Sequence, residues 1–283
     1  LVLALILDFY PPGKQINAKI QQILSNLYEF CSKHLASEPE KMVRVIKHIF
    51  VRTPDRVALK ENAAKTIHTL MKMIDDKEPV ISFIFVGAKA SKATYRSLSL
   101  ELFKLLINDE DFVLDNETKF RMIDIIKDRL IDTIPTVRAS AINAITSLIS
   151  KSDSRINEEI GLDDDNGEIY KIIENRICDE KLVVRKSTLK LIRAIVFSSE
   201  VPNFPLFELV SVRTRDRSVS IRQEAAQTLT DCMVKFEYPP ELITLWYDSI
   251  FPIALDVDVK TQELALKLID ANFLQTISSP IGE

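Results

Sequence analysis

The chain has 283 residues, of which 46% are hydrophobic and 28% are charged. This balance excludes an intrinsically disordered chain, which would be poorer in apolar residues. The formal net charge of −4 excludes a uniformly basic nucleic-acid-binding protein, although it is compatible with a local basic patch. The chain contains only five glycines, whereas β-rich and α/β enzymes need many for tight turns and phosphate loops. The composition therefore predicts an all-α fold.

Apolar residues recur at spacings of three and four along most of the chain, which is the period of amphipathic helices. This spacing predicts helices over residues 14–37, 54–74, 93–107, 118–131, 136–149, 169–177, 182–197, 218–234, 240–255 and 259–273. Prolines and an Asn-Gly pair separate these segments. Paired as antiparallel hairpins, the segments predict an α-α superhelix, or solenoid, of about six hairpins.

The chain opens with seven apolar residues, LVLALIL, which are too few to span a membrane and lack a basic flank. We therefore expect no membrane segment there. Because the chain begins with Leu1 rather than Met, we expect it to be a fragment of a longer protein. We expect residues 1–283 to form a single repeat array.

The longest interruption of the helical pattern is the acidic segment 151–168, KSDSRINEEIGLDDDNGE, which predicts an exposed loop between hairpins. Asp163, Asp165 and Glu174 have part of the spacing of a calcium-binding loop. However, Gly167 falls one place before the position at which such a loop requires glycine. The pattern favours a solvated acidic insertion over a metal site.

Four stretches of the chain share one pattern of residues, which indicates an internal repeat. Each begins with aspartate, and the aspartates are 47, 37 and 40 residues apart. Six residues after the aspartate comes a polar residue that is arginine in the first three stretches, then a small residue, then Ile or Leu. The four sets are Asp132/Arg138/Ala141/Ile145, Asp179/Arg185/Thr188/Ile192, Asp216/Arg222/Ala225/Leu229 and Asp256/Gln262/Ala265/Ile269.

This pattern has a simple physical interpretation as a stack of helical hairpins. An aspartate in the turn can cap N–H groups of the following helix, and the arginine can reach the aspartate of its own or a neighbouring repeat. The pattern resembles HEAT repeats, and the resemblance implies that Arg138, Arg185 and Arg222 form a ladder rather than contact DNA. Gln262 cannot form an ionic contact of this kind. The hairpins around Ala64 and Arg96 match the pattern only loosely.

The sequence contains no phosphate-loop, dinucleotide, zinc-protease or serine-hydrolase motif. Cys31, Cys178 and Cys232 are far apart, which predicts buried thiols in a reducing compartment rather than a disulfide framework. Cys31, His34 and His48 have spacings that match no structural zinc site, and the positions of His48 and His68 on or beside a helical stripe predict ordinary packing histidines. We therefore expect no catalytic site, cofactor, metal or small-molecule substrate.

Charge is distributed unevenly along the chain. Residues 181–222 contain nine basic and three acidic residues, whereas residues 152–180 contain three basic and ten acidic residues. A basic face could bind the phosphates of DNA without reading its sequence. The candidate phosphate contacts are Lys186, Lys190, Arg213, Arg215 and Arg217. A solvated face with local ion pairs is the alternative interpretation of the same residues.

Residues 207–270 permit a closer comparison. The stretch 215–230, RDRSVSIRQEAAQTLT, is followed by Trp246, by Pro252 to Asp256 and by TQELAL at 261–266. These motifs resemble the HEAT region of the large D-type regulatory subunits of condensin II. The resemblance implies a non-catalytic scaffold that binds a kleisin subunit, SMC ATPase subunits and DNA in mitotic chromosome condensation, in the nucleus and on chromosomes.

Other HEAT-repeat proteins remain an alternative to this interpretation. Scaffolds of nuclear transport or vesicle coats bind peptides or GTPases through acidic or apolar helices, and the basic residues of 181–222 favour the chromosomal interpretation over that one. No individual binding residue follows from the resemblance, because the matched positions are architectural.

Overall fold

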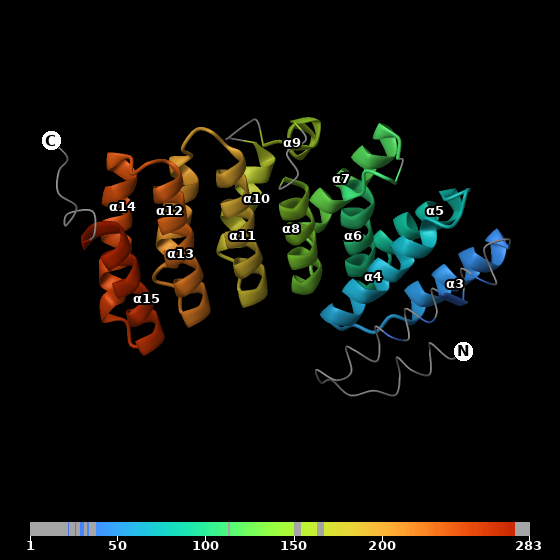
Figure 1. Cartoon of the computed structure of the whole chain (residues 1–283), viewed down its shortest axis with the longest axis horizontal. Coiled ribbons are helices and arrows are strands. Elements are labelled where there is room, and N and C mark those ends of the chain that lie inside the picture. The colour runs from blue at the N-terminus through green and yellow to red at the C-terminus, as the bar shows by residue number, and fades with distance from the viewer. Residues whose placement is uncertain are drawn as a thin grey trace. The chain divides into compact units, whose positions relative to one another are not determined.

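The computed structural model describes residues 22, 26, 29, 30, 33, 38–112, 114–149, 154–162 and 167–274, and every regular element among them is helical. The chain divides into two compact units, Leu1–Lys151 and Ser152–Glu283 (Figure 1). Each unit is a stack of antiparallel helical hairpins. The predicted all-α repeat architecture is therefore confirmed within each unit.

The first unit contains three hairpins among the described residues. Their helices are α3 (Pro39–Arg52), α4 (Val57–Met71), α5 (Glu78–Ala88), α6 (Ala93–Asn108), α7 (Asn116–Arg129) and α8 (Pro135–Ile149). The second helices of the hairpins, α4, α6 and α8, pack against one another in order. This row of second helices forms one layer, and the first helices pack on it.

The second unit repeats the arrangement with three further hairpins among its described residues (Figure 1). Its elements are α9 (Ser154–Ile160), α10 (Glu168–Ile177), α11 (Leu182–Ser198), α12 (Phe204–Arg213), α13 (Val219–Lys235), α14 (Pro240–Ile250), η1 (Phe251–Leu255), α15 (Val259–Ile269) and η2 (Asp270–Leu274). The second helices α11, α13 and α15 again pack in order, and α12 packs against α14.

Two features of the second unit depart from the helices expected from sequence. Residues 154–160 of the expected acidic loop form α9, whose Ile160 is buried, so the prediction of a loop is wrong for that part. Gly161, with φ of +87°, ends this helix in the left-handed region that favours glycine. Helix α12 was not predicted at all, as was also the case for α3 and α5 in the first unit.

Other expectations lie wholly or mostly outside the described residues. They concern the opening segment LVLALIL, most of the helix expected over residues 14–37, Cys31, His34, Asp163 and Asp165. Of the residues that the structure does describe, none lies in a helix both long and apolar enough to cross a membrane. Nor do three or more His, Cys, Asp or Glu side chains gather within the described ranges so as to hold a metal ion.

The small residues of the repeat let neighbouring helices approach closely. Ala141, Thr188, Ala225 and Ala265 are each completely buried. The Ile and Leu positions four residues further on fill the shared core beside them. No hairpin could bury this stripe alone, so the stacking of neighbours is what makes each hairpin stable.

Candidate nucleic-acid interface

The basic residues of the second unit include arginines that bind the turn aspartate of the next hairpin, an arrangement that we call the aspartate–arginine ladder. Each ladder residue is the fourth residue of a second helix, at Lys60, Arg96, Arg138, Arg185, Arg222 and Gln262. Arg185 Nη2 donates to Asp216 Oδ1 at 2.9 Å, while its Nη1 donates to the main-chain oxygen of Asp179 at 2.8 Å. One guanidinium therefore joins the turn of its own hairpin to the turn of the next.

Arg222 makes the same connection one hairpin later. Its Nε and Nη2 donate to the two carboxylate oxygens of Asp256 at 2.6 and 2.7 Å, and its Nη1 donates to the main-chain oxygen of Asp216 at 3.0 Å. Gln262 donates only to the main-chain oxygen of Asp256, at 2.5 Å. The predicted ladder role is confirmed for Arg185 and Arg222, and Gln262 keeps only the main-chain half of the contact.

We call an arginine that binds both its own turn and the carboxylate of the next turn a complete rung of the ladder. The sequence pattern missed one such rung in the first unit. Arg96 donates from Nε and Nη2 to both carboxylate oxygens of Asp132, at 2.8 and 2.9 Å, and from Nη1 to the main-chain oxygen of Ala90. It was missed because Ala90 occupies the position at which the other repeats have aspartate. Arg138 makes the main-chain contact as well, donating to the oxygen of Asp132 at 2.8 Å.

Each ladder aspartate closes its own turn as well as binding an arginine. Asp132, Asp179, Asp216 and Asp256 each accept a hydrogen bond from the main-chain N–H two residues further on, at 2.9 to 3.0 Å. That N–H lies in the turn before the helix, whereas the sequence suggested an N–H of the helix itself. This geometry is an Asx turn.

Hydrogen bonds within the ladder lower the pKa of two of its carboxylates, Asp132 and Asp256. The hydrogen bond from Arg222 lowers the pKa of Asp256, and the same pair raises the pKa of Arg222. Burial by itself would raise the pKa of Asp132, but hydrogen bonds from Arg96 and from the Ile134 N–H outweigh burial and lower it. These charges stabilise the stack and are not available to a partner.

Arg213 belongs to the same architecture. Its Nη1 lies 3.5 Å from Asp216 Oδ2, and its side chain is only 19% exposed. Arg129 and Arg176 occupy the equivalent position, three residues before the aspartate, in two other hairpins. The charge of Arg213 is therefore already paired, which makes it the weakest of the five candidate phosphate contacts.

Arg215 and Arg217 lie in the turn between α12 and α13 and are both exposed. Arg215 donates to the main-chain oxygen of Asp248 at 3.3 Å, and Arg217 donates to that of Glu180 at 2.8 Å. Main-chain carbonyls hold these side chains in place without neutralising them. Each guanidinium retains further N–H groups for a partner.

Lys186 and Lys190 lie on α11 and are not part of that turn. Lys186 Nζ is 4.0 Å from Glu224 on α13, a half-exposed and therefore weak ion pair. Lys190 is exposed and makes no side-chain hydrogen bond or ion pair with the described residues. The structure therefore places Arg215 and Arg217 in one turn, with their guanidinium groups directed to opposite neighbouring hairpins. Lys186 and Lys190 lie on the neighbouring helix α11, where Lys186 is partly paired.

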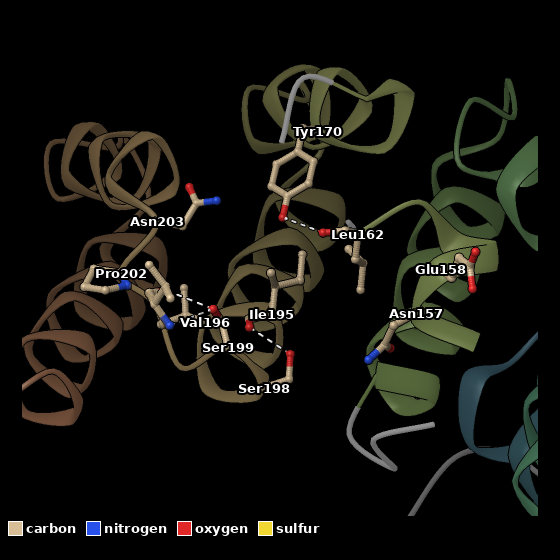
Figure 2. Close-up of a pocket in the computed structure, with 11 residues that line it drawn as sticks. Asn157, Glu158, Leu162, Tyr170, Ile195, Val196, Ser198, Ser199, Pro202 and Asn203 are labelled. Atoms are coloured by element: carbon tan, nitrogen blue, oxygen red, sulfur yellow. Dashed lines mark hydrogen bonds between the residues drawn. The ribbon is translucent and has the colours of Figure 1, made fainter. Parts of the chain in front are cut away.

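A cavity of about 460 Å³ opens elsewhere in the second unit, between α9, α10 and the end of α11 (Figure 2). The Tyr170 hydroxyl points to the main-chain oxygen of Leu162 at 3.5 Å, and the Ser198 hydroxyl donates to that of Ile195 at 2.9 Å. Apart from Tyr170, the cavity is lined by aliphatic and polar residues in equal number, with Glu158 as the one carboxylate among them. Its lining brings together no nucleophile and base.

The histidine and cysteine side chains differ in how deeply they are packed. His68 Nε2 lies 2.8 Å from Asp109, and burial lowers the pKa of this histidine. His48 is exposed, which differs from the packing role expected for it. Burial also raises the pKa of Cys232 to about 12, so this thiol is unreactive, as expected for a core cysteine. Cys178 is exposed, so the prediction of a buried thiol is wrong for this residue.

The repeat geometry agrees with comparisons to known proteins. Residues 156–192 match a sequence model described as the HEAT repeat associated with sister chromatid cohesion. The chain is 23% identical to the condensin-2 complex subunit D3-L of Xenopus laevis over 83% of this chain and 20% of that protein. It is 22% identical to the condensin-2 complex subunit D3 of Mus musculus over 82% and 19%.

The chain resembles the D3 subunits of condensin II. The predicted resemblance is thereby confirmed, and it extends well beyond residues 207–270. The chain spans about a fifth of the length of these relatives. The crystal structure of Cex1p shares the fold, with a TM-score of 0.60 and 14% identity over 100% of this chain and 54% of that one.

Proposed function

We propose that the chain is part of a non-catalytic HEAT-repeat scaffold subunit of a condensin complex of the condensin II type. The observation that carries this proposal is the similarity to two D3 subunits over more than four fifths of the chain. The ladder supports it, because a rigid stack of hairpins displays long surfaces for protein partners and has no need of catalytic groups. The proposed partners are a kleisin subunit and SMC ATPase subunits, and the proposed place of action is the chromosome in the nucleus.

The proposed function includes weak binding of duplex DNA. Arg215, Arg217 and Lys190 are the best-placed phosphate contacts, because no carboxylate of the described residues forms an ion pair with them. Lys186 and Arg213 add positive charge beside them, partly offset by Glu224 and Asp216. Contacts of this kind bind phosphates and do not read base sequence, so binding should be non-specific and should weaken steeply with salt.

Affinity purification of the full-length protein tests the assignment to a complex. We expect SMC and kleisin subunits to be recovered together with it in stoichiometric amounts. Recovery of transport receptors, coat proteins or a GTPase in their place would overturn the proposal in favour of another class of HEAT scaffold.

Charge reversal tests the DNA contacts separately. We expect the R215E/R217E variant to bind duplex DNA more weakly and to reduce the slope of log affinity against log salt by about two. The matched control is K65E/K89E, which makes the same change in net charge at two exposed lysines of the first unit. Equal loss of binding in both variants, with helicity intact, would show that net charge rather than this turn binds DNA.

A further inference from the structure

The turns of the last two hairpins have the same backbone geometry but opposite chemistry. In each, the ladder aspartate donates its N–H to the residue three places earlier and accepts the N–H two places later. Arg215 and Arg217 flank Asp216, whereas Leu255 and Val257 flank Asp256. The same two positions therefore carry a pair of cations in one hairpin and a pair of aliphatic side chains in the next.

Leu255 and Val257 are unusually exposed for aliphatic residues. Their exposed fractions are 86% and 96%, higher than those of all other large hydrophobic side chains that the structure describes. Neighbouring Ile253, Ala265 and Ile269 already fill the core of this hairpin. Packing within the hairpin thus requires neither aliphatic side chain, and exposed apolar groups gathered in one place are typical of interaction sites.

The ladder fixes the two turns side by side. The guanidinium of Arg222 contacts the main-chain oxygen of Asp216 and the carboxylate of Asp256 at the same time. We call the exposed side chains that flank the aspartates of these two neighbouring turns the turn strip. It consists of Arg215, Arg217, Leu255 and Val257. Arg215 extends toward the last hairpin, where it contacts the main-chain oxygen of Asp248, and Arg217 extends toward the preceding hairpin, where it contacts that of Glu180.

Among the described residues, no carboxylate forms an ion pair with Arg215 or Arg217. Asp216 and Asp256 bind the ladder, and Asp258 accepts the N–H and hydroxyl of Thr261 at the start of α15. Arg215 and Arg217 contact only main-chain oxygens. Pre-ordered guanidinium groups of this kind are well suited to carboxylates.

We infer that the turn strip binds a short extended segment of a partner protein that carries acidic residues followed or preceded by aliphatic residues. Duplex DNA could occupy the arginines, but its backbone offers nothing to Leu255 and Val257, which would stay in water. Packed helices lie about 8–10 Å apart, which corresponds to about three residues of extended chain. The segment should therefore place its acidic and aliphatic residues about three positions apart.

This inference goes beyond the proposed function and does not depend on it, since any HEAT scaffold could bind such a segment. The two proposals share Arg215 and Arg217 but differ at Leu255 and Val257. Serine at both aliphatic positions should weaken peptide binding and leave DNA binding unchanged, so the failure of one proposal is distinguishable from the failure of the other.

Selection of a random dodecapeptide library on the 283-residue chain tests the inference. We expect the enriched peptides to carry one or two Asp or Glu about three residues from Leu, Ile, Val or Phe. A synthetic peptide of the enriched consensus should bind the L255S/V257S variant at least about tenfold more weakly, as expected for the loss of two buried aliphatic contacts. R215E/R217E should weaken it as well.

The matched control is V201S/V234S, which removes two other exposed aliphatic side chains of the same unit, 70% and 46% exposed, one after the end of α11 and one in the last turn of α13, away from the turn strip. This variant should bind the peptide normally, and circular dichroism should show equal helicity in all variants. No enrichment, a consensus without the acidic and aliphatic pattern, or equal binding by L255S/V257S and the control would overturn the inference. Binding of DNA with no enriched peptide would leave the strip a DNA-binding surface only.

Discussion

An arginine at the fourth position of a second helix performs two tasks that other side chains share only in part. Its forked guanidinium donates to main-chain oxygens of its own turn and to the carboxylate of the next turn, as Arg96 and Arg222 do. Gln262 can reach only the main-chain oxygen. Lys60, the equivalent residue of the first described hairpin, instead pairs with Asp55 at 2.9 Å. The ladder therefore depends on the shape of arginine as well as on its charge.

Replacing Arg185 with glutamine should convert a complete rung into the incomplete one seen at Gln262. The pair of Arg185 and Asp216 is almost fully buried, with exposed fractions of 4% and 3%, so we expect a loss of about 2 kcal/mol in the free energy of unfolding. Arg193→Gln on the same helix is the control, because Arg193 is 49% exposed and its pair with Asp231 should contribute less than about 1 kcal/mol. Urea unfolding measures both, and equal losses would contradict a special role for the rung.

The ladder should also make the free energy of unfolding depend on pH. The pKa of Asp256 is lowered in the folded chain, so its contribution is fully present above the unfolded value of about 3.9 and is lost as pH falls through the folded value. We expect the free energy of unfolding to decline from about pH 4 downward. Asp256→Asn should be less stable than the natural chain at neutral pH and should lose this part of the decline. Urea unfolding from pH 6 to pH 2 measures the effect, and a constant difference between the two proteins would contradict it.

At the scale of single residues, the sequence correctly predicted the ladder contacts of Arg185 and Arg222. It missed Arg96 because the turn before that helix has Ala90, although the partner Asp132 lies in the next hairpin, where the pattern is complete. The sequence could not show that Arg213 is paired while Arg215 and Arg217 are bound only to main-chain oxygens. That distinction depends on how neighbouring turns meet, which spacing along the chain does not specify.

Close packing between α3, α5 and α6 depends on one glycine. A Cβ atom at Gly87 would lie 2.6 Å from Phe50 Cζ and 2.8 Å from Ser99 Oγ. The helix interior would ordinarily gain about 1 kcal/mol from alanine, but crowding of this kind costs about 1–3 kcal/mol. The absence of a side chain at this position therefore allows the three helices to approach.

Gly87→Ala should accordingly reduce the free energy of unfolding by about 1 kcal/mol. In a Phe50→Leu background the ring that causes the closest contact is gone, so the same change should be neutral or stabilising. A double-mutant cycle in thermal or urea unfolding measures the coupling between the two positions. If Gly87→Ala costs the same in both backgrounds, Phe50 is not what excludes the side chain.

At the scale of elements, the long amphipathic helices were predictable and the short or uniformly apolar ones were not. Helix α5 has the sequence EPVISFIFVGA, in which no polar face reveals the helical period. Helix α12 is only ten residues long and begins beside a proline. Helix α3 could have been predicted from the sequence, because four of its apolar residues have helical spacing. All four of them are buried: Met42, Ile46, Ile49 and Phe50. Helix α9 was hidden by the acidic residues around it.

At the scale of the whole molecule, the single repeat array expected from repeat spacing stays a prediction, and the structure groups the chain into two compact units that meet at residues 151 and 152. The division falls at the start of the acidic segment, where the spacing of the aspartates is longest. Sequence spacing alone could not reveal a division of contacts, because the repeat pattern continues on both sides of it. Each unit nevertheless contains complete rungs of its own, Arg96 with Asp132 in the first and Arg185 with Asp216 in the second.

The second unit should therefore fold when it is produced alone. Residues 152–283 contain two complete rungs, the cores of three hairpins and the Trp246 side chain, whose Nε1 donates to the buried Thr230 hydroxyl at 2.7 Å. We expect this fragment to show a helical circular dichroism spectrum and a cooperative unfolding transition, since three repeats suffice for a stable stack. A fragment of residues 182–283 is the control, because it lacks α10, which covers α11 through Ile169 and Ile173. It should unfold at a lower urea concentration, and a fragment 152–283 without a cooperative transition would show that the unit depends on the rest of the chain.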